Sequence, residues 1–123
     1  LITTGSPFPP VEYNGVTYHI GQANNALVFP GLGLGTIVTK SKLITDGMFE
    51  ACARAIAGMV NVGVPGAPML PKVEDLRTVS ATVAVEVAKT AMKEGVATEE
   101  PEDIIQAVQD AMWYPVYKPI RAI

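Results

Sequence analysis

The opening stretch, Leu1-Ile2-Thr3-Thr4, constrains the fold more than any other part of the sequence. Its β-branched residues predict a short buried strand, and Gly5-Ser6-Pro7 follows at once. Further prolines at positions 9 and 10 prevent the chain from continuing in a regular ladder. Because a single strand cannot make a sheet by itself, we expect it to be the last strand of a sheet whose other strands precede it, and the chain to be a fragment.

The remaining sequence predicts one β-hairpin followed by helices. Asn14-Gly15 separates two alternating runs and suits a type I′ turn, because both residue types readily adopt positive φ. Apolar residues then recur at helical spacing in four segments: 26–40, Thr45 to Met59, 73–94 and Pro101 to Met112. We therefore predict an α/β fold that is mostly helical, with about four helices, one sheet strand and a β-hairpin.

The same spacing predicts the buried face of each helix. These faces comprise Leu27, Leu34 and Val38 in the first helix; Met48, Phe49, Cys52, Ile56 and Met59 in the second; Leu76, Val79, Val83, Val87 and Ala91 in the third; and Ile104, Ile105, Val108 and Met112 in the last. Gly31, Gly33 and Gly35 lie on the first helix and favour close approach of another backbone. They do not fit a dinucleotide-binding fingerprint, because their spacing is G-x-G-x-G and they follow an Asn-rich turn.

Composition excludes several classes of function. The chain has 123 residues, of which 49% are hydrophobic, so it can bury a core. Its net charge of -3 and its lack of a basic cluster argue against binding to nucleic acid. No apolar run reaches the roughly 18 residues of a membrane span. The single Cys52 excludes a disulfide framework and suits a reducing compartment, so we expect a cytoplasmic protein with no membrane partner.

The reactive residue types of the chain have structural explanations. Cys52 lies on an apolar helix face, which is typical of an inert buried thiol. His19 has no carboxylate or nucleophile spaced to partner it, so we do not interpret it as a general base. The acidic residues at positions 99, 100, 102 and 103 complement the positive start of the last helix, and we predict no metal site among them.

One stretch indicates a ligand site: Gly21-Gln22-Ala23-Asn24-Asn25-Ala26, followed by Leu27 to Gly31. Two neighbouring Asn residues can donate and accept hydrogen bonds without carrying charge, which suits recognition of a carboxylate or a carboxamide. The alternative is that one Asn caps a helix and the other is a loop amide. Gly5 and Ser6 offer backbone N–H groups and a hydroxyl to a cofactor, although Gly, Ser and Pro together are also typical of a plain turn.

These residues form part of a longer pattern. Thr4-Gly5-Ser6-Pro7-Phe8, the run G-Q-A-N-N-x-x-x-F-P-G from Gly21, and then Ile44-Thr45-Asp46 and Leu70-Pro71 resemble the carboxy-terminal part of the malic enzyme family, which includes the malolactic enzymes. The resemblance covers essentially the whole chain. Residues 12–18 and the ending Trp113 to Tyr117 resemble the malolactic branch more closely.

The resemblance implies a fold and a set of contacts. Residues 1–123 would be the carboxy-terminal part of a Rossmann-like NAD-binding domain, itself incomplete. Asn25 matches the amide that contacts the malate carboxylate, and Asn24 matches its neighbour on the nicotinamide side. Gly5, Ser6 and Gln22 match positions along the same cleft on the cofactor side. The family's acid–base pair and the ligands of its Mg²⁺ or Mn²⁺ match nothing in this stretch, so we expect no catalytic residue and no metal ligand here.

Three functions remain open from the sequence. The first is a part of a malolactic enzyme, which converts L-malate to L-lactate and CO₂ with NAD. The second is a part of an NAD-dependent malic enzyme, which releases pyruvate and CO₂. The third is a non-catalytic helical assembly module. For the enzyme interpretations the expected partners are L-malate, the remainder of the enzyme chain and further copies in a homo-oligomer.

Overall fold

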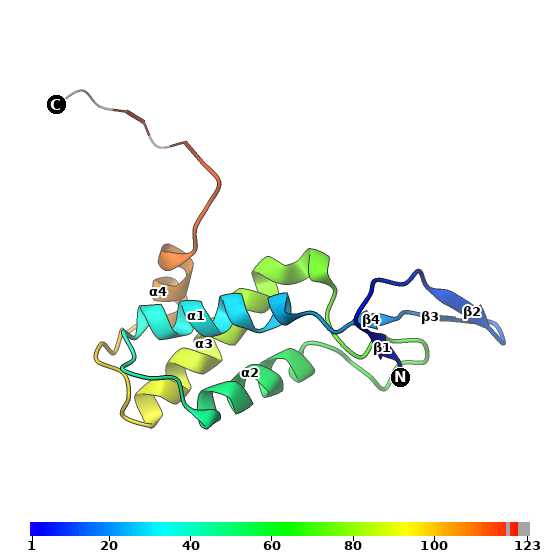
Figure 1. The fold of residues 1–123 in the computed structure, drawn as a ribbon, viewed down its shortest axis with the longest axis horizontal. Helices are drawn as coiled ribbons and strands as arrows, with labels where there is room; N and C mark the ends of the chain where they lie inside the picture. Colours follow the sequence, from blue (N-terminus) through cyan, green and yellow to red (C-terminus); the bar gives the residue numbers. More distant parts are fainter. Residues whose placement is uncertain (118, 121–123) are drawn as a thin grey trace.

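The computed structural model describes residues 1–117 and 119–120; Lys118 and residues 121–123 lie outside the described part. Four α-helices form one end of the molecule, which we call the helical body (residues 25–112). Residues 1–22 extend from it and carry all the described strands; we call them the arm (Figure 1). The chain therefore has a mainly helical α/β architecture, as predicted.

The helices begin and end close to the predicted positions. A 3₁₀ turn, Asn25–Leu27, leads into α1 (Phe29–Val38), with Pro30 in its first turn. Helix α2 spans Asp46–Gly58 and is capped by Thr45, whose Oγ1 accepts a hydrogen bond from Met48 N–H at 3.1 Å. A second 3₁₀ turn, Val73–Asp75, leads into α3 (Leu76–Lys93), after which Gly95 adopts a φ of +71°.

The start of the last helix was predicted wrongly. Helix α4 spans Ile104–Ala111, whereas Pro101 lies outside it. The Asp103 carboxylate accepts a hydrogen bond from Gln106 N–H at 2.9 Å, so Asp103 is the capping residue. A side-chain acceptor at the cap therefore sets the start of this helix more effectively than a proline with favourable φ.

The core lies where α1 and α2 pack on α3. Its buried members are Leu27, Leu32, Met48, Cys52, Ile56, Val79, Val83, Val87 and Ala91. Glycines bring α1 close to α3: a Cβ added at Gly31 would lie 2.5 Å from Val83 Cβ, and one at Gly35 would lie 2.6 Å from the Ala84 carbonyl oxygen. The predicted close approach is confirmed for these two glycines. The α1 backbone itself packs on α3, so Leu34 and Val38 are only half-buried, contrary to the predicted stripe.

The arm is built from two small sheets. Strand β1 (Thr3–Thr4) pairs in parallel with β4 (Gly21–Gln22), and β2 (Val11–Tyr13) pairs antiparallel with β3 (Val16–Tyr18). Asn14 and Gly15 both have positive φ, as predicted for the hairpin turn.

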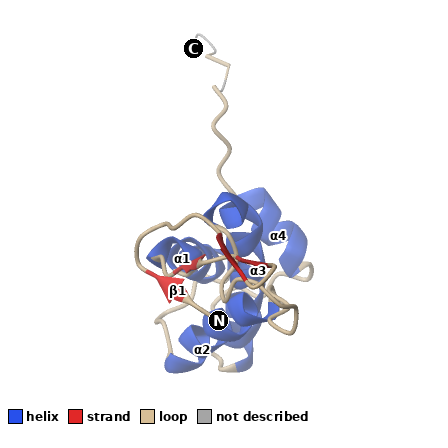
Figure 2. Ribbon diagram, turned by 90° about the vertical axis from the view of Figure 1, so that its right-hand side faces the viewer, coloured by secondary structure: helices blue, strands red, loops and turns tan. Residues whose placement is uncertain are grey.

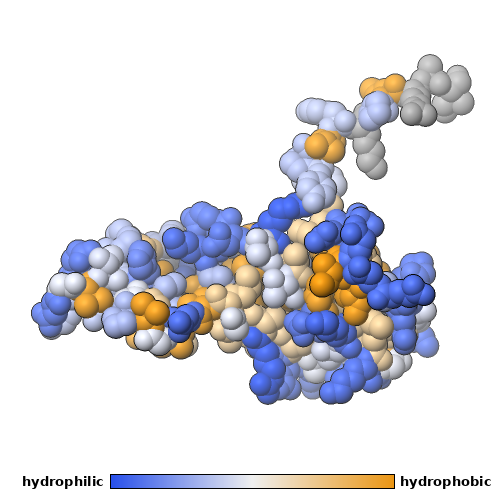
Figure 3. Space-filling model, turned by 180° about the vertical axis from the view of Figure 1, so that it is seen from behind, coloured by the Kyte–Doolittle hydropathy of each residue, from blue (hydrophilic) through white to orange (hydrophobic). Residues whose placement is uncertain are grey.

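The first strand is exposed instead of buried. Leu1 and Ile2 are 70% and 59% exposed, and β1 pairs with β4 alone among the described strands. Apolar residues reach the surface along the arm, as Figure 3 shows.

A glycine joins the arm to the helical body. Gly66, in the loop between α2 and α3, has a φ of +80°, and its carbonyl accepts a hydrogen bond from His19 N–H at 2.9 Å. A Cβ on Gly66 would lie 2.1 Å from the Thr17 carbonyl oxygen. Gly21 in β4 packs against the backbone of Leu70 in the same loop. The end-on view in Figure 2 shows the strands in front of the helices.

Residues 113–117 lead away from the helical body after α4 (Figure 1). The Arg77 guanidinium lies 3.9 Å from the centre of the Tyr114 ring, and Arg77 Nη1 donates a hydrogen bond to the Trp113 carbonyl at 3.2 Å. Within the described residues, no helix has the length and apolar character needed to cross a bilayer.

Candidate functional site

The predicted site residues follow the two parallel strands. Thr3 pairs with Gly21 and Thr4 with Gln22, so β1 and β4 end at the same edge of their sheet. Gly5-Ser6 comes directly after β1, and Ala23-Asn24-Asn25 comes directly after β4. In open α/β sheets, ligands bind outside the carboxyl ends of parallel strands. The fold therefore brings together two loops that the sequence separates by about 18 positions, at the place where such a fold binds ligands.

The carbonyls of the Gly5-Ser6 turn are hydrogen-bonded within the described residues, whereas its N–H groups are not. Thr4 Oγ1 donates a hydrogen bond to the Ser6 carbonyl at 2.7 Å, and Gln22 Nε2 donates one to the Gly5 carbonyl at 3.2 Å. Ala23 N–H donates to the Thr4 carbonyl at 2.8 Å, and this bond connects the loop after β4 to the end of β1. In the described part of the chain, the N–H groups of Gly5 and Ser6 meet no acceptor. The turn can therefore donate to a bound group.

Asn24 and Asn25 differ in their roles. Asn24 is extended, with φ -126° and ψ 130°, and its Oδ1 accepts a hydrogen bond from Ala26 N–H at 2.9 Å. It caps the 3₁₀ turn, which is the structural alternative weighed from the sequence, and its amide nitrogen remains available as a donor. Asn25 is exposed, and its side chain bonds to nothing in the described residues. Asn25 is therefore the freer of the two for ligand contact.

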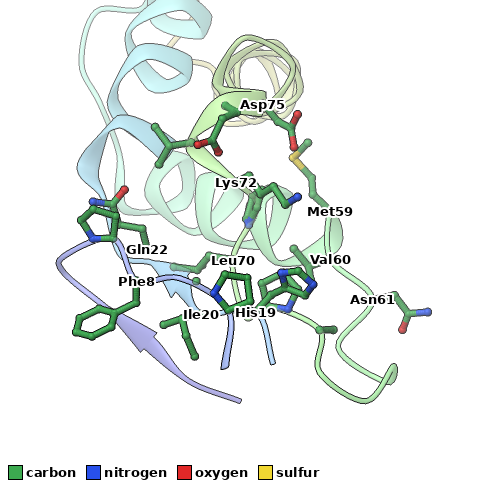
Figure 4. Close-up of a pocket in the computed structure, with 18 of the residues that line it drawn as sticks. Phe8, His19, Ile20, Gln22, Met59, Val60, Asn61, Leu70, Lys72 and Asp75 are labelled. Atoms are coloured by element: carbon green, nitrogen blue, oxygen red, sulfur yellow. The ribbon is translucent and has the colours of Figure 1, made fainter. Parts of the chain in front are cut away.

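A wide cleft lies beside these loops, between the arm and the loop that joins α2 to α3. Its volume is 1030 Å³, and its walls include Phe8, His19, Gln22, Leu70 and Lys72 (Figure 4). Among the predicted site residues Gln22 lines this cleft, whereas Gly5, Ser6, Asn24 and Asn25 are not part of its wall.

Sequence reasoning missed two residues of this region, Thr4 and Lys72. Thr4 was assigned to a strand, although its hydroxyl shapes the Gly5-Ser6 turn. A threonine immediately before a Gly-Ser turn is a residue type that bonds locally to the backbone, and this signal was available. Lys72 lines the cleft from the loop before α3, and nothing in its sequence context distinguished it from other exposed lysines.

The described residues do not fit a metal site. No group of three or more His, Cys, Asp or Glu side chains comes together within them. Cys52 is buried in the core, and burial raises the pKa of its thiol, so it is not a ready nucleophile. The described residues therefore offer no such ligand set for Mg²⁺ or Mn²⁺.

Comparison with known proteins identifies the family of the chain. The family model described as "Malic enzyme, NAD binding domain" matches residues 1–92. The chain belongs to the malic enzyme family. It is 50% identical over 117 residues to a Mycobacterium tuberculosis protein whose assigned name is malate oxidoreductase (NAD), covering 95% of this chain and 21% of that protein. It is 47% identical over 117 residues to a malolactic enzyme of Lactococcus lactis, with 95% and 22% covered.

A solved structure of this family shares the fold. The malic enzyme from Pyrococcus horikoshii superposes with a TM-score of 0.63 at 33% identity, covering 74% of this chain and 20% of that one. The chain thus spans about a fifth of the length of the malic enzyme relatives that it matches. The predicted fold class, a largely helical α/β piece of an NAD-binding domain, is confirmed.

Proposed function

We propose that residues 1–123 form the carboxy-terminal part of the NAD-binding domain of an enzyme that converts L-malate to L-lactate and CO₂. The observation that carries this proposal is the parallel register of β1 and β4, which places Gly5-Ser6 and Asn24-Asn25 at one sheet edge. The L. lactis malolactic relative and the family match support the choice of malate and NAD.

The roles of the residues follow from their free hydrogen-bonding groups. The Asn25 amide donates to a malate carboxylate, and Asn24 Nδ2 lies on the nicotinamide side while its Oδ1 holds the 3₁₀ turn. The N–H groups of Gly5 and Ser6 and the Ser6 hydroxyl hold polar groups of the cofactor. NAD, when bound, would supply the hydride acceptor for malate oxidation, and with lactate as the product the same hydride would be returned, so that no net oxidation occurs. These donors fit NAD, whereas the acid–base pair and any metal ligands must come from outside the described residues.

A second function is favoured by another relative. The M. tuberculosis protein carries a malate oxidoreductase name at a slightly higher identity than the L. lactis enzyme. In that case the same amides would bind malate, and the product would be pyruvate instead of lactate. On both proposals the enzyme works in the cytoplasm as a homo-oligomer, and the isolated 123 residues neither form NADH from malate nor produce lactate.

The test uses the full polypeptide that carries these residues. Substituting Asn25→Ala removes a hydrogen bond to a charged group, which is worth about 1.5–3 kcal/mol, so kcat/KM for malate should fall by about 10- to 150-fold. The control is Gln109→Ala, an exposed amide on α4 far in sequence from the two loops. Unchanged kcat/KM in Asn25→Ala would contradict the role of Asn25. Lactate or pyruvate as the carbon product distinguishes the two reactions.

A further inference from the structure

We infer that Gln22 is a positioning residue, which acts on the ligand through the Gly5-Ser6 turn instead of binding the cofactor itself. This inference rests on the proposed function and deepens it, because it explains how the turn comes to present hydrogen-bond donors. The carrying observation is the hydrogen bond from Gln22 Nε2 to the Gly5 carbonyl at 3.2 Å, which links the two loops after β1 and β4.

Because the peptide is planar and trans, this hydrogen bond also sets the direction of the Ser6 N–H. The C=O of Gly5 and the N–H of Ser6 belong to one planar peptide unit and point in opposite directions. When Gln22 holds the carbonyl on its own side, the Ser6 N–H is turned away from Gln22. That N–H meets no acceptor among the described residues, so it is available to a ligand.

The turn needs the hydrogen bond from Gln22 because Gly5 is conformationally free. A glycine adopts positive and negative φ with similar ease, so the Gly5-Ser6 peptide can rotate at little steric cost. A Cβ built on Gly5 would meet no atom within 4 Å, so no neighbour packs against this position. Without the Gln22 amide, rotation would bring a carbonyl acceptor to the place where the ligand needs a donor.

Thr4 fixes the other end of the turn. Its hydroxyl donates to the Ser6 carbonyl at 2.7 Å, and the Thr3 hydroxyl donates to the Gly21 carbonyl at 2.8 Å. These two bonds restrain Ser6 and the strand pair, but neither reaches the Gly5 carbonyl. Within the described residues, Gln22 is the side chain that engages that carbonyl, so its loss is not compensated.

The experiment compares two variants in the full polypeptide. Gln22→Leu removes the donor at similar size and should raise KM for NAD about five- to tenfold, with kcat changed less, because one neutral hydrogen bond orders the turn. Gln22→Glu keeps the shape but places a carboxylate against a carbonyl, and it donates only when protonated. Its KM for NAD, divided by that of the unsubstituted enzyme at the same pH, should fall as the pH is lowered from about 6 toward 4, through the ordinary glutamate pKa of about 4.3. The corresponding ratio for Gln22→Leu should not change with pH.

Thermal melting and a matched amide substitution control for folding. Gln109→Leu, on the surface of α4, should leave both the KM for NAD and the melting temperature unchanged. Two results would overturn the inference in an enzyme that remains active on malate. One is a KM for NAD in Gln22→Leu within twofold of the unsubstituted value. The other is a KM ratio between Gln22→Glu and the unsubstituted enzyme that does not change with pH. If the unsubstituted polypeptide, supplied with NAD, converts malate to neither lactate nor pyruvate, the proposed function fails first, and the inference fails with it.

Discussion

In the helical body, side chains from α1, α2 and α3 interlock around a shared core, whereas in the arm short strands are joined mainly by backbone hydrogen bonds. Every residue of the buried core cluster lies at position 27 or later, and Gly21 is the one buried residue among positions 1–22. The candidate site lies where the two regions meet. Its geometry therefore depends on individual hydrogen bonds, while the stability of the chain depends on packing.

The largest expected effect is on the packed region. Met48 is fully buried beneath α3, so Met48→Ala should lower the free energy of unfolding by about 2–5 kcal/mol through lost burial and the cavity left behind. Its neighbour Phe49 is 47% exposed, although the helical spacing predicted it to be buried. Phe49→Ala should therefore lower the free energy of unfolding by clearly less than Met48→Ala does. Equal losses for the two variants, measured by urea unfolding, would contradict the observed face of α2.

The next effect tests the contact between α1 and α3. Gly31→Ala places a methyl group against Val83 and should destabilise the chain by about 1–3 kcal/mol. Gly33→Ala is the matched control on the same helix, since its Cβ would meet nothing within 4 Å. It should stabilise by about 0.5–1 kcal/mol through a better helix propensity. Opposite shifts of the urea midpoint are expected, and shifts of the same sign would contradict the close approach.

A third substitution acts on the arm. Gly66→Ala forces a side chain into a left-handed backbone and against the Thr17 carbonyl, so it should weaken docking of the arm by about 1–2 kcal/mol. Hydrogen exchange of the His19 amide, which bonds to Gly66, should accelerate while core amides of α3 do not. Gly58→Ala, with open space around its Cβ, serves as the control. Parallel acceleration in arm and core would show that the two regions open together.

The smallest effect concerns pH. Burial raises the pKa of the Cys52 thiol above its ordinary value of 9.0, so the folded state favours the protonated thiol. This contribution to stability is complete below pH 9.0 and is lost as the pH rises from there through the folded pKa. Cys52→Ala should remove this part of the alkaline decline. A native thiol that reacts with Ellman's reagent as quickly as the unfolded chain would contradict its burial.

Local signals predicted much of the helical body. The cap at Thr45, the stop at Gly95 and the spacing from Val79 to Ala91 depend on neighbouring residues, and all three are confirmed. The errors came from choices that local sequence does not decide. Asp103 competes with Pro101 for the helix start, and the exposure of Leu34 depends on how closely α1 approaches α3.

The candidate site could be predicted only in parts. The individual residues were identified from their types and from the family pattern, but no strand was predicted at Gly21-Gln22. The pairing of β1 with β4 was therefore not predicted, although the family pattern implied that Gly5, Ser6, Gln22 and Asn24 lie along one cleft. A two-residue strand has too few side chains to show alternation, so its partner is decided by tertiary contacts. The roles of Asn24 and Asn25 in binding remain predictions.

The hairpin lies on the connection between two strands that pair directly with each other, so its tip can change length while β1 and β4 keep their register. Gly15 faces open space at that tip. The Asn14-Gly15 turn is consequently a natural point for grafting a short peptide or a fluorescent reporter, because it lies at the outer end of the arm, away from the helical body (Figure 1).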